Sequence, residues 1–350
     1  MMALDNEVMN EKTTQTRFLH VANGSSTTTT IEAAGIPGRC SIWADVLYEG
    51  PVPGELSDAE LVELRKQFLA GPADHTGLAW AGNDPTLDPV NDLGRWRAVI
   101  EAHEDYDELI LWFEHDLFDQ LNLIQLLPWI RDRLPASKPV SLICIGAFPG
   151  RPDFKGLGEL TPGELASLLD TRERISDAQY ELAGRAWHAF RAPTPEALDR
   201  LRRDDTSALP YLAAALTRFL QEFPWTNDGL SRTERRLLAL AAGDSIALWT
   251  AFPRMHEGEQ FYYVSDGTMA SMAETLAGTT PALLVLDVSA ASGHVLRGTI
   301  ALTDSGRSVL AGQLDRVAAC GIDRWLGGVH LQGRRDVWRW DEESGRVVRI

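Results

Sequence analysis

A cluster of ionisable and polar side chains follows an apolar segment at residues 108–113. The cluster consists of Glu114, His115, Asp116, Asp119 and Gln120, and a second apolar segment with helical periodicity comes after it. Open α/β sheets place their ligand-handling groups in this way, where a buried strand ends and a helix begins. Carboxylates at such a point can bind a divalent cation or transfer protons as general acids and bases. Glu114 and Asp116 are therefore the first candidates for a catalytic site.

Asp45 is a third candidate acid, because it lies at the end of another strand-like segment, residues 39–46. In a parallel sheet, Asp45, Glu114 and Asp116 would meet at one edge and could hold Mg²⁺, which prefers carboxylate oxygens. Alternatively, one of these acids could act as a general base, with His115 or Glu114 as a proton carrier. The structural alternative is that the acids only cap helices and bind loop amides.

A set of ligand-binding candidates follows the apolar segment 18–23. It comprises Asn23, Gly24, Ser25, Ser26 and Thr27. Hydroxyl groups and free backbone N–H groups at the start of a helix can cradle a phosphate or a carboxylate. The segment is neither a Walker loop nor a GxGxxG fingerprint, and its hydroxyls could equally serve only as helix caps. Glu49 begins a loop, residues 49–53, that two prolines make stiff. This loop could therefore form one wall of the same pocket. His115 is a further candidate for binding the ligand there.

The elements that position these residues are four strand-like segments, each followed by a turn and mostly by a helical pattern. The expected strands cover residues 18–23, 39–46, 108–113 and 139–145. This alternation predicts a doubly wound, mostly parallel α/β sheet of the Rossmann-like kind. The right-handed crossover rule then places all four carboxyl ends on one edge of the sheet. Between the strands we expect helices from Ser57, where Glu60 completes a capping box, and over 95–104 and 118–134.

The remainder of the chain has a different pattern. Residues 161–222 are predicted to be helical, including 173–190 and 208–220. Further helices are expected at 231–242, 244–252 and 268–277. Strands at 282–288 and 295–302 follow them, on either side of a turn at 291–293. Three helices followed by a hairpin is the order of a winged helix. The predicted organisation is a disordered tail over 1–16, an α/β domain over 17–155, a helical connector over 156–228, and a winged-helix-like α+β domain with a C-terminal β-hairpin over 229–350.

The charge of the chain bears on its partners. The net charge is −17, of which residues 229–350 contribute −1 and residues 1–228 contribute −16. An acidic N-terminal part repels phosphate backbones, and segment 268–277, which would be the recognition helix, has no Lys or Arg. We therefore expect a small-molecule ligand rather than nucleic acid, and a C-terminal domain that packs or forms a homodimer.

Cellular location is predicted from three further features. The N-terminus lacks the apolar core of a signal peptide, and we expect no membrane span. Cys40, Cys144 and Cys320 are far apart and in no metal-binding spacing, so neither a disulfide framework nor a zinc site is indicated. These features favour a reducing cytoplasm.

Several motifs together resemble the bacterial family known as domain of unknown function 1835. They are LHVANGSST (19–27), IWADVLYEGPVP (42–53), LILWFEHDLFDQLNLIQLL (109–127), RAWHAF (185–190), FPWTNDGLSRTERRLL (223–238) and RWLGGVHL (324–331). The resemblance covers nearly the full chain. The family pattern tends toward Asn-Gly-Asp-Ser, so Ser25 stands where an acid is usual. The resemblance implies no settled activity; some members are labelled as transcription-related.

Two functions follow as expectations. The first is an enzyme of hydrolysis or group transfer that acts on a nucleotide or another phosphorylated or anionic metabolite at the carboxyl edge of the sheet. The second is a ligand-sensing regulator whose C-terminal domain contacts DNA or a protein partner.

Overall fold

The computed structural model describes residues 16–70, 88–288 and 296–350. Its N-terminal part contains a five-stranded sheet with the order β2-β1-β4-β5-β6. The strands are β1 (Phe18–Ala22), β2 (Arg39–Ile42), β4 (Glu108–Glu114), β5 (Val140–Ile145) and β6 (Glu173–Arg174). The first four are parallel and β6 pairs antiparallel with β5. The predicted α/β class with a mostly parallel sheet is confirmed.

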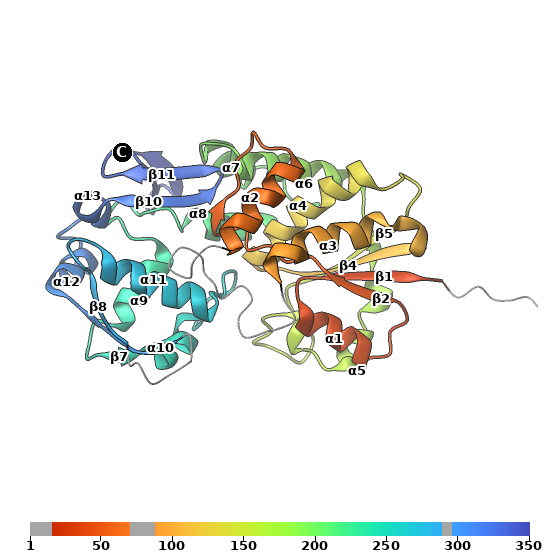
Figure 1. The fold of residues 1–350 in the computed structure, drawn as a ribbon, viewed down its shortest axis with the longest axis horizontal. Coiled ribbons are helices and arrows are strands. Elements are labelled where there is room, and N and C mark those ends of the chain that lie inside the picture. Colours follow the sequence, from red (N-terminus) through yellow and green to blue (C-terminus); the bar gives the residue numbers. More distant parts are fainter. Residues whose placement is uncertain (1–15, 71–87, 289–295) are drawn as a thin grey trace, which may run out of the picture.

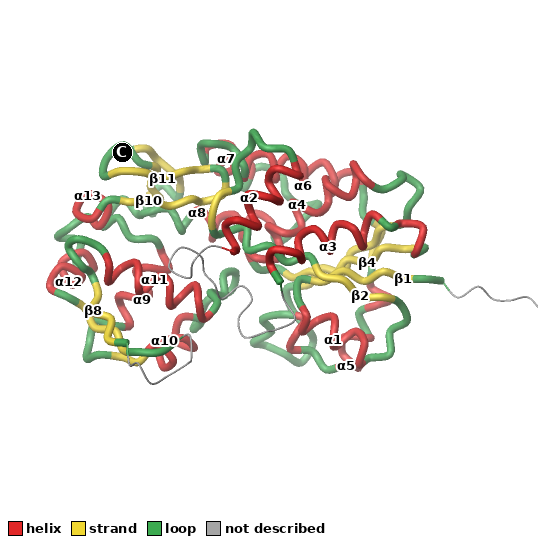
Figure 2. Tube along the Cα trace, viewed as in Figure 1, coloured by secondary structure: helices red, strands yellow, loops and turns green. Residues whose placement is uncertain are grey.

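Helices cover both faces of this sheet, as Figures 1 and 2 show. One face carries α1 (Ser25–Ala33) and α5 (Pro162–Ala166), and the other carries α2 (Asp58–Ala70), α3 (Pro89–Glu101) and α4 (Leu117–Arg133). From β1 the chain runs first to β2 on one side and later to β4 on the other side. The strand order therefore reverses between β1 and β4, and doubly wound proteins bind ligands at the carboxyl ends of strands at such a point.

Strand β4 lies in the centre of the sheet and is apolar on both sides. Leu109, Leu111 and Phe113 belong to the core under one helical layer, whereas Ile110 and Trp112 belong to the core under the other. All five side chains are fully buried. This strict alternation follows from the two-residue period of a strand, and it explains why the sequence here is a continuous apolar run.

A helical region follows the sheet. It contains α6 (Asp177–Phe190), α7 (Glu196–Leu201) and α8 (Leu212–Leu220). The predicted helix over 173–190 was wrong at its start, because residues 173–174 form β6 and Ser176 then begins α6 through a reciprocal capping box with Gln179. The cap fixes where the helix begins. Residues 173–174 therefore lie outside the helix and pair with the edge of β5.

The C-terminal part begins with α9 (Arg232–Leu240), β7 (Ile246–Ala247), α10 (Leu248–Met255) and α11 (Asp266–Gly278). Strands β8 (Leu284–Asp287) and β9 (Thr299–Leu302) follow, and the three strands form an antiparallel sheet in the order β7-β9-β8. This order of elements is that of a winged helix, so the α+β class predicted here is also confirmed. The helix predicted over 244–252 begins later than expected because β7 precedes it; the predicted turn at 291–293 lies outside the described residues.

Helices α12 (Asp304–Leu310) and α13 (Arg316–Cys320) lead into two hairpins. The hairpins are β10 (Ile322–Gly327) with β11 (Val329–Gly333), and β12 (Trp338–Asp341) with β13 (Arg346–Arg349). The loop predicted after residue 46 contains a short strand, β3 (Gly50–Pro51), which pairs parallel with β10. The Val52 N–H also donates to the Gly327 carbonyl at 2.9 Å, so the C-terminal hairpin is bound to the N-terminal domain.

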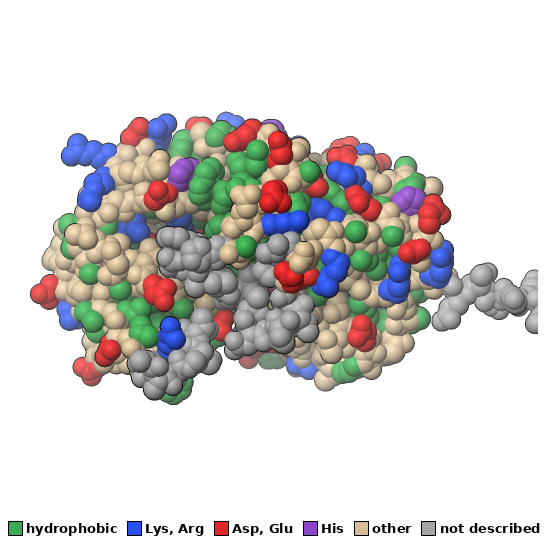
Figure 3. Space-filling model, in the orientation of Figure 1, with side chains coloured by type: hydrophobic (Ala, Val, Ile, Leu, Met, Phe, Trp, Pro, Cys, Tyr) green, Lys and Arg blue, Asp and Glu red, His purple; other side chains and the backbone are tan. Residues whose placement is uncertain are grey.

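The surface gives two further observations. In the part of the chain that the structure describes, no helix combines the length and apolar character that crossing a membrane requires. On the face shown in Figure 3, acidic and basic side chains are interspersed and do not form one broad field of either sign.

Candidate functional site

The carboxyl ends of β1 and β4 meet three acids of the segment 114–119. Glu114 is the last residue of β4, and Asp116 is the N-cap of α4, where its Oδ1 accepts the Asp119 N–H at 2.9 Å. The capping role expected as the alternative for Asp116 is thus present. The cap also directs the first turn of α4 back toward the sheet edge, which brings Asp119 to the two strand ends.

Asp119 joins the two strands. Its Oδ1 accepts the Asn23 side-chain amide at 2.7 Å, and its Oδ2 accepts the Glu114 backbone N–H at 2.5 Å. Thr27 Oγ1 donates to the other end of the Asn23 amide at 3.3 Å, and Gln120 donates to the Glu114 carbonyl at 2.7 Å. Asp119 is fully buried. The geometry brings Asn23 and Glu114 together as predicted, and it does so through Asp119, which was not among the predicted site residues.

The carboxyl group of Glu114 is covered by a later loop. Leu157 N–H donates to Glu114 Oε1 at 2.5 Å, and a side chain at Gly156 would collide with the same carboxyl group. Glu114 is only 4% exposed, whereas Asp116 and Asn23 are partly exposed. Asp116 and Asn23 therefore form the accessible side of the cluster.

Burial raises the pKa values of Glu114, Asp116 and Asp119. Burial, together with the charge of Asp116, raises the pKa of Glu114 to about 8, and burial raises the pKa of Asp116 to about 6. The pKa of Asp119 lies well above its ordinary value for the same reason, with Glu114 and Asp116 adding to the shift. At neutral pH Glu114 is therefore mainly protonated, whereas Asp116 is mainly ionised.

His115 points into an aromatic surrounding. Its ring lies 5.7 Å from Phe261, 6.1 Å from Tyr211 and 6.4 Å from Phe154, measured between ring centroids. His115 is 7% exposed, and among the described residues its Nδ1 has no hydrogen-bond partner. Burial lowers the pKa of His115, so the ring is neutral at pH 7. A buried polar atom without a partner is uncommon in proteins and is a natural contact for a bound molecule.

A segment of the C-terminal part completes the surroundings of the cluster. The Leu117 N–H at the start of α4 donates to the Phe261 carbonyl at 2.6 Å, and Tyr262 contacts Tyr48 with ring centroids 4.8 Å apart. Burial and the negative charges of Asp116, Glu259, Glu159 and Glu114, in that order, raise the pKa of Tyr263 to about 12. The Tyr263 hydroxyl is therefore protonated and lies in the field of the acids. Sequence reasoning missed Tyr263, because no local pattern links residue 263 to the sheet edge.

Asp45 lies in a separate, structural cluster. Its carboxylate accepts Arg65 Nη2 at 2.7 Å and Arg65 Nε at 3.1 Å, and both side chains are buried, at 3% and 1% exposure. Arg65 also donates to the carbonyls of Val46 and Glu49, at 2.9 and 2.6 Å. The Asn122 side-chain amide pairs with the Asp45 backbone N–H and carbonyl, each at 2.9 Å. The structure thus commits Asp45 to holding the 45–49 turn against α2 and does not bring it together with Glu114 and Asp116.

The expected magnesium site finds no support in this arrangement. Within residues 16–70, 88–288 and 296–350, no three His, Cys, Asp or Glu side chains are placed to hold a metal ion. With a pKa of about 8, Glu114 carries little of the negative charge at neutral pH that would attract Mg²⁺. Acid–base chemistry is the property that the cluster retains.

The predicted anion cradle forms the N-terminus of α1. Gly24 is the N-cap in an extended conformation, so the N-cap residue itself supplies no side-chain oxygen to the first turn. Thr27 and Thr28 are buried, and Thr28 Oγ1 donates to the Ser25 carbonyl at 3.1 Å, whereas Ser26 is exposed. The backbone at Gly158 lies against Ser26, so the loop that covers Glu114 also borders this helix end.

Glu49, expected to form a pocket wall, contacts the C-terminal part. Its Oε1 accepts the Thr268 hydroxyl of α11 at 2.6 Å. This contact and the Tyr48–Tyr262 contact hold the winged-helix-like unit against the loop that follows β2.

Comparison with known proteins adds no assignment. No protein-family model matches the chain, and no curated protein is detectably similar to it. The residues of the site therefore carry the functional proposal themselves.

Proposed function

We propose that this chain is an enzyme of hydrolysis or group transfer that binds a small anionic metabolite at the junction of β1 and β4. The observation that carries this proposal is the cluster of Glu114, Asp116 and Asp119 at the point where the strand order reverses. Groups with strongly shifted pKa values in such a position are typical of catalytic sites, although ion-pair networks can produce them too.

The different pKa values of two of these acids suggest their roles. Glu114, with a pKa of about 8, holds a proton at neutral pH and can donate it to a leaving oxygen. Asp116, with a pKa of about 6, is mostly ionised and can accept a proton from an attacking water or hydroxyl group. A pair of carboxyl groups whose surroundings separate their pKa values is a common way to assign acid and base.

The ligand would lie between these acids and the start of α1. The N-terminus of α1 favours an anionic group such as a phosphate, because its backbone N–H groups and dipole are positive there. The unpartnered Nδ1 of His115 offers one further hydrogen bond. A nucleotide or another phosphorylated metabolite has both an anionic group and a leaving oxygen.

A binding and activity screen tests this proposal. Nucleotides and phosphorylated metabolites are screened by thermal shift, with and without Mg²⁺, and the compounds that bind are then tested for turnover. Glu114→Gln keeps a neutral, hydrogen-bonding side chain, so binding should persist while turnover falls at least about 100-fold, a typical loss for a missing general acid. Asp116→Asn should lower turnover similarly, and Glu181→Gln, at an exposed position on α6, should change neither. Unchanged turnover in both site variants would refute the assignment.

The second candidate is a ligand-sensing regulator, and the β7-β9-β8 sheet with α10 and α11 favours it. The resemblance to the domain of unknown function 1835 family points in the same direction. Against it, α11 has no Lys or Arg, and residues 267–270 at its start are buried. A regulator of this kind should retain duplex DNA at low salt and lose it steeply as salt rises, whereas the proposed enzyme should not.

A further inference from the structure

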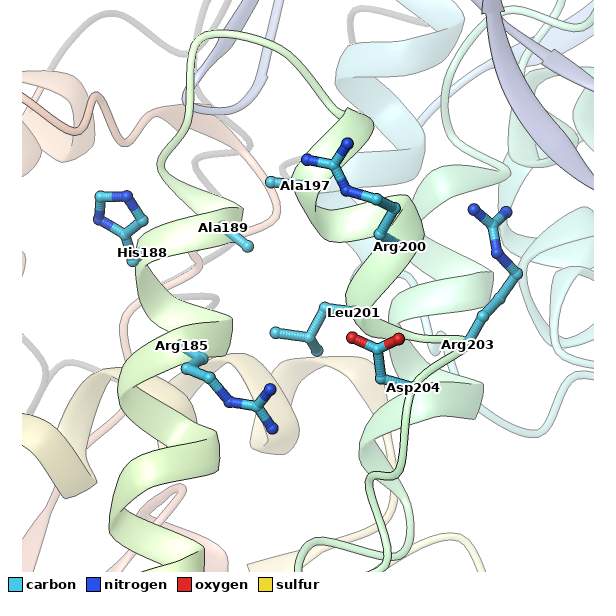
Figure 4. A pocket seen from close by; sticks show the side chains of 8 residues that line it. All are labelled: Arg185, His188, Ala189, Ala197, Arg200, Leu201, Arg203 and Asp204. Atoms are coloured by element: carbon cyan, nitrogen blue, oxygen red, sulfur yellow. The ribbon is translucent and has the colours of Figure 1, made fainter.

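A hollow of about 370 Å³ lies between α6 and the segment 196–204, remote in the chain from the acid cluster. Its lining residues are Arg185, His188, Ala189, Ala197, Arg200, Leu201, Arg203 and Asp204. Positions 185, 188 and 189 share one face of α6, and positions 197, 200 and 201 share one face of α7, because residues three and four apart are neighbours on a helix. The two facing stripes, joined by the turn after residue 190, create the hollow shown in Figure 4.

The stripes contain both apolar and charged members. Ala189, Ala197 and Leu201 supply apolar surface, and the two alanines leave the space that larger side chains would fill. Arg185 and Asp204 extend into the gap between the two segments, with Arg200 at one end of it (Figure 4). The volume falls in the range of about 300–1,000 Å³ that is usual for small-molecule sites.

Three of the four basic side chains that line this hollow take no part in the ion pairs of the fold. Among the described residues, the side chains of Arg185, His188 and Arg200 make no hydrogen bond or ion pair, and all three are exposed. By contrast, the neighbouring Arg202 and Arg203 both bind Asp199, each at 2.7 Å. Arg185 makes no ion pair but lies close enough to Asp205 to contribute to the lowered pKa of that carboxyl group, whereas Arg200 adds a positive charge to a chain of net charge −17.

We propose that this hollow is a second binding site, which takes a small phosphate ester that carries hydroxyl groups. Arg200 binds the phosphate at the Ala197 end of the hollow, for which a planar guanidinium group is well suited, and Arg185, toward the other end (Figure 4), adds to the positive field. Asp204 accepts a hydrogen bond from a hydroxyl group of the ligand, and the apolar surface of Ala189, Ala197 and Leu201 contacts its carbon skeleton. A bare polyanion is disfavoured, because Asp204 would repel it.

The experiment follows the His188 imidazole signal by NMR while ribose 5-phosphate is added to the full-length protein. The chain has 8 histidines, and His188→Gln identifies the signal. A saturable shift is expected with ribose 5-phosphate and not with ribose. The double variant Arg185→Ala/Arg200→Ala should weaken binding at least about tenfold, since charged hydrogen bonds contribute most of the affinity. Ala197→Met, which fills the hollow without changing charge, should weaken binding as well.

Two matched controls separate this site from the proposed enzyme site. Arg335→Ala removes an exposed arginine elsewhere and should leave the titration unchanged, and so should Glu114→Gln. No saturable shift in the unmodified protein, or equal affinity in the double variant, would overturn the proposal. Loss of binding in Glu114→Gln would also overturn it, because the titration would then report the sheet edge.

Discussion

The ion pair between Asp45 and Arg65 allows a quantitative test of which acids are structural. Asp45→Asn removes one charge and leaves the Arg65 guanidinium buried at 1% exposure beside a neutral amide. Breaking a buried, hydrogen-bonded pair in this way costs about 3–5 kcal/mol. For 350 residues, with an unfolding entropy of about 2.1 cal/mol/K per residue, this free energy lowers the melting temperature by about 4–7 °C.

The assay is thermal unfolding of three variants at one pH and ionic strength. Arg17→Met breaks the pair with Asp107, whose side chains are 56% and 46% exposed, and should lower the melting temperature by about 1 °C or less. The double variant Asp45→Asn/Arg65→Met removes both charges and should recover part of the loss. An Asp45→Asn protein that melts normally but no longer binds ligand would refute the structural role and return Asp45 to the site.

Three further predictions concern pH, a turn and a helix cap. The pKa of Glu114 in the folded state, about 8, lies above its ordinary 4.5, so the stability that Glu114 contributes is complete below about pH 4.5 and is lost as the pH rises to 8. In denaturant titrations, Glu114→Gln should therefore flatten the decline of the unfolding free energy between pH 5 and 8. An unchanged slope would contradict the raised pKa. Gly327→Ala places a Cβ 2.5 Å from the Phe190 carbonyl oxygen, at a residue whose φ is 60°. It should lower the unfolding free energy by at least about 1–3 kcal/mol in the same titrations. An unchanged unfolding free energy would mean that the turn is mobile. Ser231→Ala should cost about 1 kcal/mol because it removes the cap on the Glu234 N–H, whereas Ser231→Thr should keep most of that stability; equal losses in the two variants would argue against capping.

The fold was predictable where a local signal defined each element. The capping box predicted at Ser57 is present in the structure, and Thr161 and Ser231 begin α5 and α9 with the same reciprocal glutamate partner. The apolar run before Glu114 defined the central strand. The short strands β3 and β6 were not predictable, because two residues carry no period and pair only when another segment presents an open edge.

The site was predictable in its location and only partly in its members. Asn23 and Glu114 were expected at a common edge because parallel strands share their carboxyl side. Asp119 was not predicted as a site residue, since its spacing from Asp116 shows which turn of α4 it occupies but not which strand that turn meets. The same limit applied to Asp45, whose partner Arg65 comes from a helix that sequence spacing could not orient.

The pairing of β3 with β10 has a consequence for how this protein is made. Gly50 pairs with Leu326, so the two partners are 276 residues apart in the chain. At a synthesis rate of about 5–20 residues per second, the ribosome needs roughly 14–55 seconds between the two. During that interval the nascent 49–53 loop lacks its final neighbour, and a chaperone that shields exposed strand edges would have its natural substrate there. Synthesis of β10, rather than completion of the N-terminal sheet, then becomes the step that closes the molecule.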